Sequence, residues 1–123
     1  MKNSSEVNFK RALANLRRAV STPAIEPRDQ SGIIKDFEMT YELSWKVLKK
    51  ILLEQGHQTL GAKDVFSKAY QLNFISNETL WLKMIEDRNL TTHVYDESEA
   101  EKIVKRIMKD FLPLFETLEL LLK

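Results

Sequence analysis

The sequence of 123 residues contains no cysteine, which excludes disulfide bonds and thiolate metal sites. It has only three glycines and three prolines, too few for the many tight turns of an all-β fold. No apolar run approaches the length of about 18 residues that a membrane span requires, and the N-terminus lacks the apolar segment of a signal peptide. We therefore expect a soluble, cytoplasmic protein with no membrane association.

An excess of charge of either sign is also absent. The 19 basic and 18 acidic residues give a formal net charge of +1, so the whole chain exerts no strong attraction on nucleic acid or membranes. A role on nucleic acid would require a local basic patch, and the lysines available for one are Lys35, Lys46, Lys49 and Lys83.

Helical periodicity is what the sequence does contain. A first amphipathic helix is predicted for residues 4–20, and a long one for residues 28–55, with Gly56 as its C-terminal cap. A shorter helix is predicted for residues 62–71. The long helix carries one continuous apolar stripe, formed by Ile34, Phe37, Tyr41, Trp45, Leu48 and Leu52.

Two further helices are predicted in the second half of the chain. Ser76 is the expected N-cap of the fourth helix, in which Trp81, Met84 and Ile85 face inward. Asp96 with Glu99 resembles a capping box at the start of the last helix. Pro113 lies well inside that helix and should kink it or lie near a break.

Together these elements predict an all-α fold, an antiparallel up-and-down helical bundle of four main helices plus one short helix. We expect residues 1–123 to form one domain, because their number suits a single hydrophobic core. The second helix is long for so small a domain, and a homodimer that packs along it would explain its length.

Arg88 is the first candidate functional residue, because the helical periodicity places it on the inward face of the fourth helix. A guanidinium there needs an anionic partner, either a protein carboxylate or a ligand phosphate. Glu38 borders the apolar stripe of the long helix and is the carboxylate best placed to pair with it. Glu42, one turn further on, is either a supporting residue or simply solvated.

His93 is the second candidate. It can approach Arg88 only if the fourth helix ends near Thr91, and the two threonines before the histidine favour such an end. A histidine at a helix end serves either as a general acid or base near neutral pH, or only as a partner of the helix dipole. The same helix-dipole interpretation suffices for His57.

Some chemistries have no motif in this sequence. The two histidines are not spaced as metal ligands, no glycine-rich phosphate loop is present, and we expect no metal and no cofactor. The chain also lacks the Gly-Ser and paired aspartates with which a nucleotidyltransferase holds magnesium. If nucleotide transfer is involved, another protein performs it.

Two stretches, "RNLTTHVYD" and "IIKDFEMTYELSWKVLK", resemble the nucleotidyltransferase substrate-binding protein family of the HEPN superfamily, which includes the HepT-like toxins of HEPN–MNT toxin–antitoxin pairs. The resemblance extends from about Arg28 to the end of the last helix. It implies a dimeric helical bundle and, as its partner, a separately encoded MNT nucleotidyltransferase that acts as antitoxin.

The resemblance also implies roles for residues. The family's ribonuclease motif, an arginine followed after four to six residues by a histidine, is matched by Arg88 and His93, with Asn89 as the polar residue after the arginine. Tyr95 occupies the position of an adenylyl acceptor. The supporting residues are Glu38, Glu42 and Asp87.

The implied function is metal-independent cleavage of RNA at a dimer cleft, regulated by adenylylation. The alternatives are a non-catalytic substrate-binding or regulatory subunit of the nucleotidyltransferase, and a purely structural helical dimer.

Overall fold

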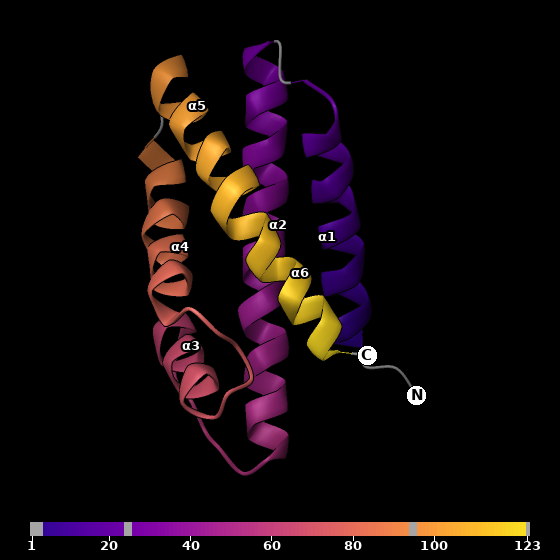
Figure 1. Cartoon of the computed structure of the whole chain (residues 1–123), viewed down its shortest axis with the longest axis vertical. Coiled ribbons are helices and arrows are strands. Elements are labelled where there is room, and N and C mark those ends of the chain that lie inside the picture. Colours follow the sequence, from indigo (N-terminus) through magenta and orange to yellow (C-terminus); the bar gives the residue numbers. More distant parts are fainter. Residues whose placement is uncertain (1–3, 24–25, 94–95, 123) are drawn as a thin grey trace.

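The computed structural model describes residues 4–23, 26–93 and 96–122, and all of its regular elements in these ranges are helical (Figure 1). This confirms the predicted all-α fold. The elements in chain order are α1 (Ser4–Ser21), α2 (Pro27–Glu54), α3 (Ala62–Gln71), α4 (Glu78–Leu90), a 3₁₀ turn (Thr91–His93), α5 (Glu97–Arg106), a π-helical turn (Ile107–Phe111) and α6 (Leu112–Leu121).

Helix α2 is the centre of the bundle. It contacts α1, α3, α4, α5 and α6, and Figure 1 shows it running the full height of the molecule with α1 and α4 on either side. The chain passes up α1, down α2, up α4 and down α5 and α6, which is the antiparallel up-and-down topology that the sequence predicts (Figure 1).

Aromatic side chains join the helices into one hydrophobic core. Trp81 of α4 lies against Phe66 of α3 and Phe115 of α6, with ring centroids 4.8 and 6.0 Å apart. Phe37 of α2 stacks on Phe111 at 5.6 Å. Because these rings are fully buried and come from both halves of the chain, they support the proposal that residues 1–123 form a single domain.

The ends of α2 follow local sequence signals. Pro27 occupies the first helical position, where its missing N–H costs nothing. At the other end Gly56 adopts φ +88°, its N–H donates to the Leu53 carbonyl oxygen (3.0 Å), and the His57 N–H donates to that of Leu52 (2.8 Å). This is a Schellman motif, and it confirms Gly56 as the C-terminal cap.

The predicted N-cap of α4 is wrong. The cap is Asn77 instead of Ser76, and its side-chain oxygen accepts a hydrogen bond from the Leu80 N–H at 3.3 Å. Asn77 has φ 60° and ψ 60°, a left-handed conformation that asparagine adopts more readily than serine. Serine and asparagine are both common N-cap residues, so residue type alone does not show which of the two caps α4. The backbone conformation of the turn decides it.

The last helix begins at the predicted cap residue, and a π-helical turn interrupts it beside Pro113. The Asp96 carboxylate accepts a hydrogen bond from the Glu99 N–H at 2.8 Å, which confirms it as the N-cap of α5. Pro113 is the second residue of α6 and directly follows the π-helical turn. The regular α-helix is interrupted there because proline has no N–H to donate to the preceding turn.

Candidate functional site

The junction between α4 and α5 contains most of the residues that the sequence singles out. Helix α4 ends at Leu90 and continues as a 3₁₀ turn, as the sequence predicts. The Thr92 hydroxyl donates to the Asn89 carbonyl oxygen at 2.9 Å, and the Thr91 hydroxyl lies 2.7 Å from the Arg88 carbonyl oxygen. These bonds satisfy carbonyl groups that the ended helix leaves without partners.

Arg88 meets the carboxylate that the sequence proposed for it. Its Nη1 lies 3.3 Å from Oε2 of Glu38, and the Thr91 hydroxyl lies 2.7 Å from the same oxygen. The two charged side chains retain 26% and 30% of their exposure, so the pair is only partly withdrawn from water. Glu38 therefore holds Arg88 in place between α2 and α4, and the guanidinium remains accessible.

The Arg88 guanidinium is not fully satisfied by Glu38, and its charge acts on the buried phenol of Tyr41. Its Nε is buried and has no hydrogen-bond partner among the described residues. Tyr41 is 5% exposed, and burial raises the pKa of its hydroxyl to about 12, with the Glu42 charge adding to the rise and Arg88 opposing it. Arg88 thus retains unused donor capacity beside a neutral phenol.

Glu42 does not join the Arg88 pair. Its carboxylate accepts a hydrogen bond from Trp45 Nε1 at 3.3 Å, and no ion pair connects it to Arg88 in the described ranges. Its side chain is half-buried, not fully solvated, because the Trp45 ring lies at the edge of the core. The structure therefore brings Glu38 to the arginine and leaves Glu42 on the neighbouring face of α2.

Asp87 has a partner that the sequence did not suggest. Its carboxylate is fully buried and accepts hydrogen bonds from Nε and Nη2 of Arg106 at 2.5 and 3.1 Å, while Lys83 Nζ lies 3.8 Å away. Arg106 lies in α5, so sequence spacing gave no signal for the pair. In the sequence, Asp87 was named only as a supporting residue that the family resemblance implies. A buried carboxylate requires a cation, but no pattern marked Asp87 as buried.

His93 faces a different neighbour from Arg88. It is exposed and lines a cavity of about 270 Å³ between the end of α4 and helix α5. No described hydrogen bond or ion pair joins it to Arg88. Although the two residues are close in sequence, they contact different helices of the same chain. Arg88 pairs with Glu38 of α2, and His93 faces α5. The cavity is lined by Leu90, His93, Glu99, Lys102, Ile103 and Arg106.

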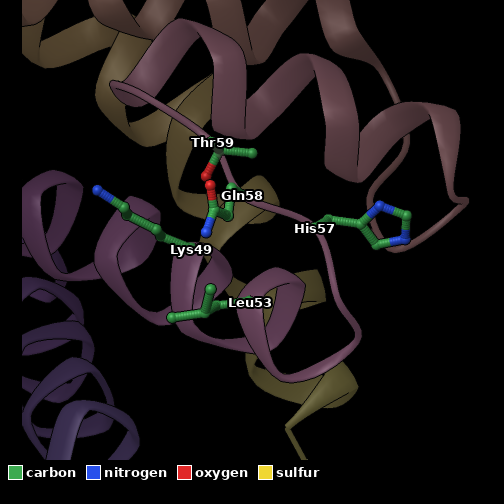
Figure 2. A pocket seen from close by; sticks show the side chains of 5 residues that line it. All are labelled: Lys49, Leu53, His57, Gln58 and Thr59. Carbon is green, nitrogen blue, oxygen red and sulfur yellow. The ribbon is translucent and has the colours of Figure 1, made fainter.

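The other histidine belongs to a separate pocket. His57 follows the end of α2, at the opposite end of the bundle from the α4–α5 junction (Figure 1). It lines a cavity of about 230 Å³ with Lys49, Leu53, Gln58 and Thr59, and Figure 2 shows its imidazole pointing away from Lys49. The lining of this pocket contains no carboxylate that could orient the His57 ring.

Three further observations concern the adenylyl-acceptor candidate, metal binding and membrane spans. Tyr95 lies outside the described residues. Within the described ranges, no group of histidine, aspartate and glutamate side chains is arranged to hold a metal ion. No described helix is long and apolar enough to cross a membrane.

Comparison with known families identifies the fold and its lineage. The family model described as "Nucleotidyltransferase substrate binding protein like" matches residues 6–123, almost the whole chain. The chain belongs to this family. The match covers every described helix except the first residues of α1, so it confirms the resemblance that the two sequence stretches carry.

One similar protein is a probable ribonuclease HepT from Haemophilus influenzae. It is 33% identical to this chain over 87 residues. The matched region is 67% of this chain but only 59% of the length of that relative.

Solved structures show the same fold. A protein from Thermus thermophilus superposes with a TM-score of 0.83 and 31% identity, over 89% of this chain and 94% of that one. A Haemophilus influenzae protein, described as having the fold of a substrate-binding domain of a nucleotidyltransferase, gives a TM-score of 0.82 and 28% identity, over 94% and 97%. A tri-AMPylated Shewanella oneidensis HEPN toxin, solved in complex with its MNT antitoxin, gives 0.79 over 99% and 98%, and at 18% identity it supports the fold alone.

Proposed function

We propose that this chain is the HEPN-type component of a HEPN–MNT toxin–antitoxin pair and a metal-independent endoribonuclease. The observation that carries the proposal is the α4–α5 junction. There the accessible Arg88 is fixed by Glu38, and a 3₁₀ turn leaves His93 exposed beside a cavity. The similar probable ribonuclease HepT supports the activity, and the family model together with the 28% identical substrate-binding domain of a nucleotidyltransferase supports the partner.

The chemistry would be attack of an RNA 2′-hydroxyl on the adjacent phosphate. One group must take the proton of the 2′-hydroxyl, and another must give a proton to the departing 5′-oxygen. Each chain supplies one suitable histidine, so a two-fold dimer would supply both groups from two copies of His93. Arg88 would stabilise the negative charge of the phosphate, since its guanidinium suits phosphate oxygens. Asn89, which is exposed next to it, would orient the substrate or the backbone.

Adenylylation of Tyr95 by the partner nucleotidyltransferase would regulate this activity. An adenylyl group added two residues after His93 brings both bulk and negative charge, and both oppose the binding of RNA. Incubation with the partner and ATP, followed by mass spectrometry, tests the assignment. The proposal expects modification at Tyr95 and none at Tyr70, which is 45% exposed and serves as the matched control.

A second candidate function is favoured by the Glu38 contact. Because Glu38 already pairs with Arg88 inside one chain, the arginine needs no phosphate to balance its charge. The chain would then be a non-catalytic substrate-binding or regulatory subunit of the nucleotidyltransferase. It would keep the same fold and partner.

The His93→Ala variant separates these two functions. The ribonuclease proposal expects loss of RNA cleavage with binding of the nucleotidyltransferase retained, because His93 is exposed and its removal leaves the core intact. Absence of RNA cleavage by both wild type and variant, with binding of the nucleotidyltransferase retained in both, would support the non-catalytic subunit.

A further inference from the structure

The cavity beside His93 contains positive charge that the proposed cleavage chemistry does not use. Lys102 and Arg106 are one turn apart on α5, so their side chains share a face of that helix, and both line the cavity. Among the described residues of the lining, Glu99 is the only acidic one, and the buried Asp87 pairs with Arg106 from outside the lining. Lys102 and the remaining N–H donors of Arg106 therefore offer cationic contacts to an anionic ligand, although the whole chain is nearly neutral.

Arg106 is held in a fixed orientation. Its Nε and Nη2 are both occupied by Asp87, at 2.5 and 3.1 Å, and that carboxylate is fully buried. A guanidinium carries five N–H donors, and the two on Nη1 make no hydrogen bond among the described residues. The Arg106 side chain is still 31% exposed, so a preoriented donor remains for a ligand in the cavity.

Lys102 supplies a second, mobile cation at the same wall. It is exposed and takes part in no ion pair within the described ranges. Two acidic side chains lie on the same helix as Lys102 or at its cap: Glu99 lines the cavity, and Asp96 has a pKa lowered first by the Glu99 N–H and the Ser98 hydroxyl, with Lys102 contributing last. Because neither forms an ion pair with Lys102 among the described residues, its ammonium group is available to a phosphate bound in the cavity.

The remaining walls are apolar. Leu90 is 49% exposed at the end of α4, and Ile103 lies almost fully buried beneath the cavity. An exposed leucine beside two cations offers contact area to a ribose or a base, while the cations take the phosphate. A cavity of about 270 Å³ has room for a single small group of this kind and no more.

We propose that this cavity is a nucleotide-binding subsite. Lys102 and Arg106 bind the phosphate of one RNA nucleotide, and Leu90 contacts its sugar or base, next to the nucleotide on which His93 acts. The assignment of RNA as the source of that nucleotide rests on the proposed ribonuclease function. This structure adds a second element with cationic side chains, α5, to the junction that contains Arg88 and His93.

The test measures binding without cleavage. The probe is a fluorescent 2′-O-methyl RNA oligonucleotide, which lacks the attacking hydroxyl, and its Kd is measured by anisotropy at several salt concentrations. Lys102→Gln should weaken binding about five- to tenfold and lower the slope of log K against log salt by about 0.7, the value for one contact to a single strand. Lys105→Gln makes the same charge change at an exposed position of α5 outside the cavity, and should change Kd less than about twofold.

Lys102 is the informative position because Arg106 also stabilises the fold. Removal of Arg106 would leave the buried Asp87 charge without its main partner, and a loss of binding would then be ambiguous. Competition adds a second measurement. AMP should displace the probe at lower concentration than inorganic phosphate, because it also contacts Leu90.

The outcomes separate the subsite from the ribonuclease. Equal effects of Lys102→Gln and Lys105→Gln, absence of RNA binding by wild type, or competition by phosphate as strong as by AMP would each overturn the subsite. Lys102-dependent binding in a protein that never cuts ordinary RNA would retain the subsite and reject the ribonuclease. RNA cleavage that requires His93 but is unchanged by Lys102→Gln would retain the ribonuclease and reject the subsite.

Discussion

Arg88 illustrates how far single residues can be interpreted from sequence. The helical periodicity placed it on the inward face of α4, and the need for an anion then pointed to Glu38, which the structure confirms at 3.3 Å. Asp87 follows the same physical rule, yet its partner Arg106 was missed. Glu38 could be proposed as the partner of Arg88 because it borders the apolar stripe of the long helix. No sequence pattern linked Arg106 in α5 to Asp87 in α4, so that pair was not predicted.

The Glu38–Arg88 pair predicts a stability effect. Glu38→Gln removes the charge but keeps the size of the side chain, and it should lower the free energy of unfolding by about 1 to 2 kcal/mol, between exposed and buried ion pairs. Chemical denaturation measures this. Glu42→Gln is the control, because Glu42 has no ion pair to lose in the described ranges, and should cost less than about 0.5 kcal/mol. Equal losses in the two variants would contradict the assigned role of Glu38.

Tyr41 predicts a dependence of stability on alkaline pH. Burial raises its pKa from 10.0 to about 12, so the unfolded chain ionises first as the pH rises. The contribution is present in full below pH 10 and is lost between pH 10 and about pH 12, to a total of about 2 to 3 kcal/mol. Denaturation of wild type and Tyr41→Phe across that interval measures it. The variant should lack this part of the decline, and parallel curves would refute the assignment.

Among the helices, apolar periodicity located the elements correctly, whereas the choice of N-cap residue was less reliable. Helix α2 was predicted within a residue or two of its observed ends, because a long apolar stripe, a proline and a glycine all mark it. The start of α4 was wrong by one residue. Ser76 and Asn77 are both good N-cap types, and only the backbone conformation, with φ 60° at Asn77, distinguishes them.

The assignment of Asn77 as the N-cap of α4 can be tested by substitution. Asn77→Ala removes the bond to the Leu80 N–H and places alanine in a left-handed conformation, so it should destabilise the protein by about 1 to 3 kcal/mol. Ser76→Ala should change stability by less than about 0.5 kcal/mol, since Ser76 is exposed and is not the residue that caps α4. Thermal denaturation of the two variants compares them. A larger effect at Ser76 would restore the original prediction.

At the scale of the whole molecule, the sequence predicted the bundle and its topology but not the shape of the candidate site. His93 could approach Arg88 only if α4 ended near Thr91, and α4 does end there. Within one chain, Arg88 pairs with Glu38 of α2 and His93 lines a cavity against α5. Contacts between helices far apart in the sequence decide such placements, and periodicity within one helix carries no information about them. The homodimer, which would bring two copies of the junction together, stays a prediction.

The proposed ribonuclease requires that His93 at the α4–α5 junction cleaves RNA through the 2′-hydroxyl. The most direct measurement is the chemistry of the RNA ends formed in EDTA by wild type, His93→Ala, Arg88→Ala and His57→Ala, the last being the matched histidine at the opposite end of the bundle. We expect 2′,3′-cyclic phosphate and 5′-hydroxyl ends from wild type and His57→Ala, with cleavage lost in the other two variants. Folded wild-type protein that cuts no RNA, or cleavage that survives His93→Ala, would contradict the proposal.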